Sequence, residues 1–227
     1  MSSRKILINL STAAFCLIGF SLFNKALASL GGFRSPYVNQ AKNVEQRRTL
    51  GSGTRSQCKV AFQPNTLTLL VPDESVVHKT ASSQPSFYVQ TKIGSKTPLN
   101  FTIVDPEVSE PIAQRLITVS EPGIKKIELP NQIQLEQKKV YLWYIGVRCS
   151  NNFNYHEILT SSVEFVPTST MVQKKLRSST KTLKTAEIYA QNGYWYDALD
   201  TSFKGRSSSG SASLYFQQLL SDVGLTF

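Results

Sequence analysis

Few residues in this chain could do acid–base or metal chemistry. The run DPEVSE places carboxylates at Asp105, Glu107 and Glu110. Paired carboxylates can serve glycoside hydrolysis or calcium binding. A calcium loop would usually add further Asp and Asn ligands and a glycine turn, which this run lacks. Because the run starts with the turn-forming pair Asp105-Pro106, we expect an exposed turn between two strands.

The two histidines, His78 and His156, are the other candidates for proton transfer. A serine triad needs one of them beside a serine and a carboxylate, and no G-x-S-x-G elbow presents such a serine. His156-Glu157 lacks the second histidine of a helical zinc-protease motif. No glycine-rich phosphate loop or Cys/His cluster is present. We therefore expect no catalytic residue, cofactor or metal, and we expect both histidines to be solvated in polar turns.

The stretch YAQNGYWYDALD, from Tyr189 to Asp200, could form an aromatic platform for a ligand. Its helical spacing favours the core of a helical hairpin, in which small residues let two helices approach and aromatic rings fill the wedge beside them. The spacing looks like one tetratricopeptide unit, and because such repeats need about three copies for stability, the hairpin must pack against other parts of the chain. The expected hairpin residues are Ala186, Tyr189, Ala190, Gly193, Trp195 and Ala198.

A basic stripe is the most regular polar feature of the chain. It consists of Lys174, Arg177, Lys181 and Lys184, which fall on one side of a predicted helix. Such a stripe could contact anionic lipid headgroups or an acidic envelope polymer. The alternative is an ordinary solvated helix face.

The elements that must position these residues change character along the chain. Residues 58–167 hold about seven short β-rich runs separated by turn formers, a pattern that predicts an immunoglobulin-like antiparallel β-sandwich. Alternation is visible at Leu99, Phe101 and Ile103, and again at Tyr141, Trp143, Ile145 and Val147. Leu135 followed by Tyr141 predicts a corner at which the tyrosine hydroxyl bonds back to the preceding backbone.

Residues 168–227 follow a helical pattern instead. Thr170 and Gln173 have the spacing of a capping box, and Gly193 can end the first helix in a left-handed conformation. The region is expected to form the hairpin and then a terminal helix. The apolar side of that terminal helix carries Leu214, Phe216, Leu219, Leu220 and Val223.

The N-terminus predicts export. Residues 1–28 have a basic start, an apolar middle and an Ala-Leu-Ala end, the parts of a signal peptide cleaved after Ala28. An uncleaved membrane anchor is the alternative. Residues 29–57 are poor in apolar side chains and are expected to form a flexible basic leader. The mature chain, at about +7, would have no membrane span, would be periplasmic or secreted, and would meet no nucleic acid.

Export also bears on the cysteines. Cys58 and Cys149 would survive processing, and an oxidising compartment would let them persist as a disulfide worth about 2–4 kcal/mol. Two separately buried thiols are the alternative.

Several segments together resemble the uncharacterised secreted cyanobacterial proteins grouped as domain-of-unknown-function family 928. The matching segments are GTRSQC, LTLLVP, PSFYVQ, EPGIKKIELP, LEQKKVYLWYIGVRC, IYAQNGYWYDAL and LLSDVGL. The resemblance implies no activity, ligand or catalytic residue, because the family has none established. Gln137-Lys138 stands where a glycine-bearing turn would be expected.

The sequence therefore favours a non-catalytic interaction or structural module of the cell envelope, with an envelope protein or an anionic envelope polymer as partner. The alternative is a wall-directed hydrolase with a carboxylate site around Asp105.

Overall fold

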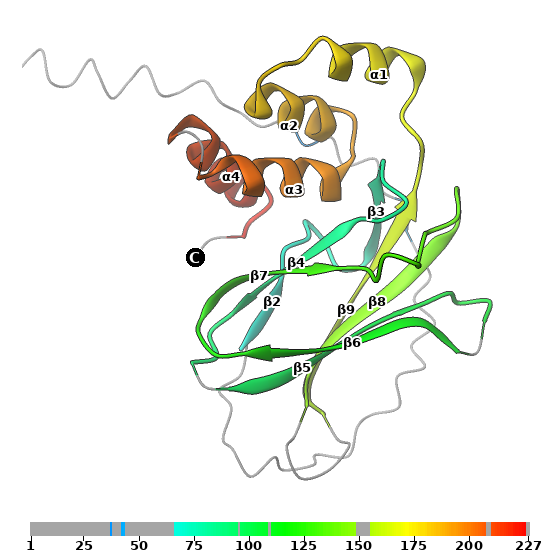
Figure 1. The fold of residues 1–227 in the computed structure, drawn as a ribbon, viewed down its shortest axis with the longest axis vertical. Helices are drawn as coiled ribbons and strands as arrows, with labels where there is room; N and C mark the ends of the chain where they lie inside the picture. Colours follow the sequence, from blue (N-terminus) through cyan, green and yellow to red (C-terminus); the bar gives the residue numbers. More distant parts are fainter. Residues whose placement is uncertain are drawn as a thin grey trace, which may run out of the picture. The chain divides into compact units, whose positions relative to one another are not determined.

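The structure is a computed structural model that describes residues 37, 42–43, 66–94, 96–108, 110–148, 155–207 and 210–225 (Figure 1). Strands come first along the chain and helices follow. The strands are β1 Lys42–Asn43, β2 Leu67–Leu69, β3 Val76–Thr80, β4 Ser86–Thr91, β5 Thr97–Val104, β6 Pro111–Val119, β7 Gly123–Glu128, β8 Val140–Arg148 and β9 Tyr155–Phe165. The helices are α1 Thr170–Arg177, α2 Thr182–Gln191, α3 Trp195–Gly205 and α4 Gly210–Asp222.

The strands form two sheets. The larger sheet has the order β1-β3-β9-β8-β5-β6, and the smaller has the order β2-β4-β7. The expectation of purely antiparallel sheets was wrong at one place, because β3 runs parallel to β9. After the turn at Pro72–Ser75 the chain passes from the smaller sheet to the larger, and there it pairs with β9. Strand β3 was not predicted, because the polar residues His78 and Lys79 follow its two β-branched valines and break the apolar pattern.

The predicted alternation is confirmed in the strands that line the core. In β5 the buried residues Leu99, Phe101 and Ile103 alternate with half-exposed ones, and β8 buries Trp143 and Ile145 in the same way. Phe87 of β4 lies across from them, with its ring centroid 5.1 Å from that of Phe101 and 5.0 Å from that of Trp143. The two sheets therefore face each other across one aromatic core.

The predicted tyrosine corner is present before β8. The backbone N–H of Glu136 donates to the Tyr141 hydroxyl at 3.1 Å. In the same turn Lys138 has a φ of 62°, a left-handed conformation that usually favours glycine. Its N–H donates to the Phe165 carbonyl at 2.8 Å, and this bond helps to hold a lysine where a glycine was expected.

The helices pack on the sheets through α3. That helix contacts β3 and β4, and its residues Trp195, Tyr196 and Leu199 belong to the core that the two sheets share. The α4 residues Phe216, Leu219 and Leu220 join the same core, whereas Leu214, expected on the buried side, is 59% exposed. Helix α1 packs on α2 above this layer, through Val172 (Figure 1).

The helical pattern after Pro167 was partly misassigned. A single helix was expected up to Gly193, but α1 ends at Arg177 and α2 begins at Thr182. The residues between them include Ser178, Ser179 and Thr180, whose hydroxyl groups compete for backbone bonds; the Ser178 hydroxyl, for example, donates to the Lys175 carbonyl. The N-cap of α1 is Ser169 rather than Thr170, because the Ser169 hydroxyl accepts the Val172 N–H.

Candidate functional site

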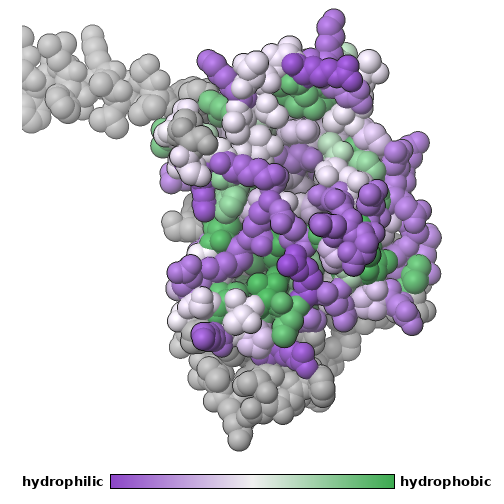
Figure 2. Space-filling model, in the orientation of Figure 1, coloured by the Kyte–Doolittle hydropathy of each residue, from purple (hydrophilic) through white to green (hydrophobic). Residues whose placement is uncertain are grey.

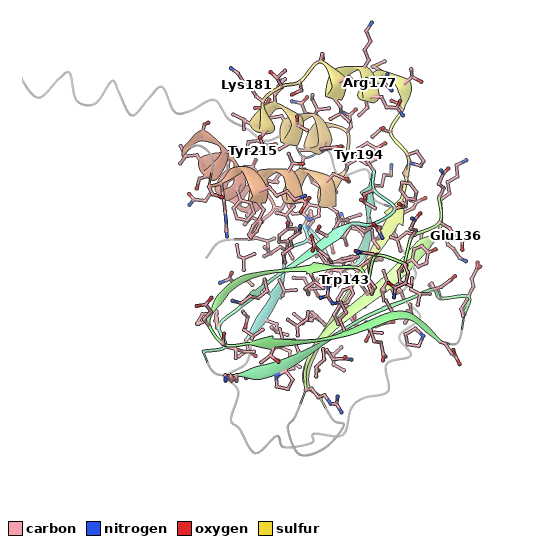
Figure 3. All side chains as sticks on the ribbon, in the orientation of Figure 1. Glu136, Trp143, Arg177, Lys181, Tyr194 and Tyr215 are labelled. Carbon is pink, nitrogen blue, oxygen red and sulfur yellow. The ribbon has the colours of Figure 1, made fainter. Side chains whose placement is uncertain are left out.

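The basic stripe spans two helices and the turn between them. Lys174 and Arg177 lie on α1, Lys181 is the N-cap of α2, and Lys184 lies in the first turn of α2. Lys175 adds a fifth cation, and we call these five residues the basic surface. All five are exposed. Figure 2 shows hydrophilic side chains gathered over α1, and Figure 3 places Arg177 and Lys181 at the end of the helical layer away from the sheets.

The charges of the basic surface are largely uncompensated. No acidic residue occurs between Glu164 and Glu187 in the sequence. Among the described residues the ion pair of this surface joins Lys184 to Glu187, at 3.0 Å. Helix α1 carries its cations in its last turn, where they also interact favourably with the helix dipole. The arrangement can attract an anion or an anionic surface, and it contains no group placed for proton transfer.

The hairpin residues come together between α2 and α3. Ala186 and Ala190 of α2 and Ala198 of α3 are fully buried, and Tyr189 is half-buried. Gly193 has a φ of 77°, the left-handed conformation expected at the end of the first helix. Trp195 is 0% exposed and its indole N–H donates to the Leu70 carbonyl at 2.8 Å. A ring held in this way inside the protein cannot serve as a platform for a ligand in solvent.

Polar bonds that were not predicted join α3 to the sheets. The Tyr196 hydroxyl accepts the Trp143 indole N–H at 2.9 Å and donates to the Ser162 carbonyl at 3.0 Å. Figure 3 shows Trp143 between the two sheets. Tyr196 lay within the quoted aromatic stretch, but its spacing could not show which strand would receive its hydroxyl. These bonds satisfy polar atoms that would otherwise be costly to bury.

Two aspartates of α3 also bond to the strands and loops below. The backbone N–H of Ala81 donates to the Asp197 carboxylate at 2.7 Å. Burial raises the pKa of Asp197 to about 6, although the bonds from Ala81 and Thr80 oppose the rise. The Tyr88 hydroxyl donates to Asp200 at 2.6 Å.

Burial likewise acts to raise the pKa of Asp200. The bonds from Lys204 and Tyr88, together with the charge of Lys126, outweigh that effect, so the pKa of Asp200 lies below its usual value. Asp200 therefore stays ionised within an ion-pair network, whereas the raised pKa of Asp197 places its titration near pH 6.

His78 does not lie in a solvated turn, as we expected, but in β3. It is 1% exposed, its Nε2 lies 2.8 Å from the Asp73 carbonyl, and its Nδ1 lies 3.0 Å from the Tyr37 hydroxyl. Burial lowers the pKa of His78, so the neutral ring is favoured. His156 lies in β9 rather than in a turn, and its side chain is outside the described residues. The flanking valines of VVHKT were the signal for a buried position.

Tyr37, from the segment expected to be a flexible leader, is half-buried in the structure. Its ring meets that of Trp195 edge to face, with centroids 5.0 Å apart.

The acidic run does form a turn, but Asp105 is not exposed. Its carboxylate accepts the Glu107 N–H at 2.9 Å and pairs with Lys139 at 2.5 Å. The bond from Lys139, followed by that from Glu107, holds the pKa of Asp105 below its usual value. Glu107 and Glu110 are exposed. The Asp105 carboxylate is thus already paired with the ammonium group of Lys139.

Three further expectations concern metals, membranes and the cysteines. Within the described ranges no group of three or more Cys, His, Asp or Glu side chains is placed to hold a metal. The helices α1–α4 are all too short or too polar to cross a membrane. Cys58 and Cys149 lie outside the described residues, so the disulfide stays a prediction.

These features define a protein built from two facing β-sheets and a C-terminal helical layer, with an exposed basic surface on that layer. The chain belongs to the family described as Domain of Unknown Function (DUF928), whose profile matches residues 50–227. A family 76 glycoside hydrolase from a bovine Bacteroides thetaiotaomicron strain is similar in structure at 12% identity and a TM-score of 0.28. That match covers 48% of this chain and 23% of the hydrolase. A search among curated proteins found no match.

Proposed function

We propose that this chain is exported and acts as a non-catalytic envelope module that holds an anionic envelope polymer through its basic surface. The observation that carries the proposal is the run from Phe165 to Ala186, which contains five cations and no acid. Helix α1 contacts α2 and lies apart from the sheets, so its cations are accessible to a large partner. An envelope protein with an acidic surface is the other partner of matching charge.

Export is supported by the signal-like residues 1–28. After export Cys58 and Cys149 would form the disulfide proposed above, and we place the protein in the periplasm or outside the cell.

We further propose that the two sheets form an immunoglobulin-like sandwich. The immunoglobulin letters A, B, C, C′, E, F and G can be given in chain order to β2 and to the strands from β4 to β9. With β1 and β3 set aside, the smaller sheet is then A-B-E and the larger sheet is C′-C-F-G. Trp143 then stands two residues after the corner tyrosine, where antibody domains carry the second cysteine of their buried disulfide. In this chain the contacts among Phe87, Phe101 and Trp143 fill that space. The α2–α3 pair, with its alanine crossing and glycine turn, supports a single tetratricopeptide-like hairpin.

A binding assay tests the proposed function. Each cation near an anionic surface contributes about 1 kcal/mol, so the variant Lys174→Gln, Arg177→Gln, Lys181→Gln should bind an anionic polysaccharide about 100-fold more weakly. The matched control is Lys92→Gln, Lys96→Gln, Lys138→Gln, which removes three exposed cations outside the helices. Binding should be measured by co-sedimentation at two salt concentrations. Equal losses in both variants would show only a general charge effect and would contradict the proposal.

The alternative of a wall-directed hydrolase is less well supported, because Asp105 is bound by Lys139. Hydrolysis of wall glycans by the purified chain, lost in an Asp105→Asn, Glu107→Gln variant, would favour the alternative instead.

A further inference from the structure

Strand β6 forms a free edge of the larger sheet. It stands last in the strand order and pairs with β5, so one side of its backbone has no partner strand among the described residues. Gln114, Arg115, Leu116 and Thr118 are all exposed. A long edge with unpaired N–H and C=O groups is a template on which another strand can form hydrogen bonds.

The edges of the smaller sheet are protected, whereas that of β6 is not. Strand β2 has three residues, and the Leu67 N–H at its start is bound by the Glu157 carboxylate. Strand β7 carries Lys125 and Lys126, charges of the kind that discourage strand addition. The cation of β6, Arg115, folds back instead, and its guanidinium donates to the Glu128 carbonyl at 2.7 Å. That bond ties β6 to the opposite sheet and draws the guanidinium toward β7.

The usable part of β6 is the run that pairs regularly with β5. The pairing of β5 with β6 shifts register between Ile103 and Val104, so the regular segment of β6 runs from Ala113 to Val119. Its midpoint is Leu116, which is 59% exposed. If two copies pair antiparallel about this midpoint, Leu116 meets the Leu116 of the second copy, and Gln114 lies opposite Thr118.

This register also avoids repulsion. Arg115 lies opposite the second copy's Ile117, whereas a two-fold axis at Arg115 would set two guanidinium groups face to face. Apolar leucines meeting across an axis, without opposed like charges, make the strand complementary to itself. The second copy is therefore the occupant that the strand fits.

We propose that two copies of this chain pair antiparallel through β6, with Leu116 on the two-fold axis. The pairing joins the two larger sheets into one continuous sheet and is closed, because the same segment is used on both sides. It is independent of the basic surface, which lies on the helices.

Two measurements test the proposal: the oligomeric state and chemical cross-linking. Both use the full-length chain after it has been expressed and processed in its own cells. We expect a dimer in sedimentation velocity at micromolar concentration, and a monomer for Leu116→Lys. The matched control is Ile158→Lys, which changes another exposed leucine-sized side chain of the same sheet, on β9 and outside the proposed pairing segment. Circular dichroism should show that both variants keep the fold.

The register is tested with single cysteine variants and a short bismaleimide linker. The Leu116→Cys variant should form more cross-linked dimer than the wild-type chain does. Gln114→Cys and Thr118→Cys should cross-link to each other when mixed, and each alone should remain at the wild-type level.

Three results would overturn the pairing. One is a chain that stays monomeric at every concentration tested, whether or not an extended peptide from another protein binds to β6. Another is a dimer that survives Leu116→Lys, and the last is a dimer lost equally in Leu116→Lys and Ile158→Lys, which would indicate that sheet faces stack.

Discussion

At the scale of single residues, the carboxyl group of Asp197 sets the clearest pH dependence. Burial raises its pKa to about 6, and Asp200, Tyr189 and Tyr194 are the titratable groups that lie near it. Its pKa in the unfolded chain is near 3.8, so the folded state binds the proton more tightly. The contribution of Asp197 to stability is therefore greatest at low pH and is lost as the pH rises from about 4 to about 6.

The prediction is that Asp197→Asn stabilises the chain at pH 7 relative to wild type, on the order of 2 kcal/mol. Asparagine can still accept the Ala81 N–H through its side-chain oxygen, and it is never charged. The advantage should shrink towards pH 4, where wild-type Asp197 is neutral too. Urea unfolding of both proteins at several pH values measures the difference. A difference that does not change between pH 4 and pH 7 would contradict the assignment.

At the scale of elements, the α2–α3 hairpin depends on a glycine outside the stretch first singled out. Gly205 ends α3, and a Cβ built there would lie 2.7 Å from the Thr182 Cγ2 and 3.2 Å from the Ala212 Cβ. Helices α2, α3 and α4 thus approach at this point more closely than any side chain allows. In the sequence Gly205 only precedes the serine-rich run RSSSGS, which gives no local sign of a close helix contact.

We predict that Gly205→Ala destabilises the protein by about 1–2 kcal/mol, although alanine is the better helix former. Thr182→Ser removes the methyl group in the way and keeps the hydroxyl. In that background the same glycine substitution should cost less, by about 1 kcal/mol, as a double-mutant cycle of thermal unfolding can show. If Gly205→Ala lowers stability equally in both backgrounds, the contact with the Thr182 methyl group is not the source of the strain.

At the scale of the whole molecule, the sheets and helices share one core. Trp143 of β8 and Tyr196 of α3 are joined by a hydrogen bond, and Trp195 of α3 bonds to Leu70 beyond β2. Separating the helices would leave these polar atoms unpaired and expose several aromatic rings, so neither part should fold alone.

The expected outcome is one cooperative unfolding transition in urea. Tryptophan fluorescence, which reports on Trp143 and Trp195, should change at the same midpoint as the helical circular dichroism signal. Tyr196→Phe should lower both midpoints together, because it leaves the Trp143 N–H unsatisfied at a cost of about 1–3 kcal/mol. Tyr144→Phe, on the outer face of β8, is the matched control. A helical signal lost before the fluorescence would show that the helices are independent.

Local patterns were sufficient to predict much of the secondary structure. The alternation of Leu99, Phe101 and Ile103, the corner at Tyr141 and the turn at Gly193 each follow from neighbours a few residues apart. The strand β3 and the break after Arg177 were missed, because a buried histidine and hydroxyl side chains give weak local signals.

The amino-acid sequence by itself determined the β-then-helix order, the family resemblance and the cationic run from Lys174 to Lys184. Only the tertiary structure decided the parallel pairing of β3 with β9 and the free edge at β6. It also decided the bonds of Tyr196 and Asp197 to the strands and loops, and the ion pair between Asp105 and Lys139. The physical reason is that periodicity and charge order are local properties of the chain. A hydrogen bond, a raised pKa or an unpaired edge depends on residues that come close only when distant segments pack together.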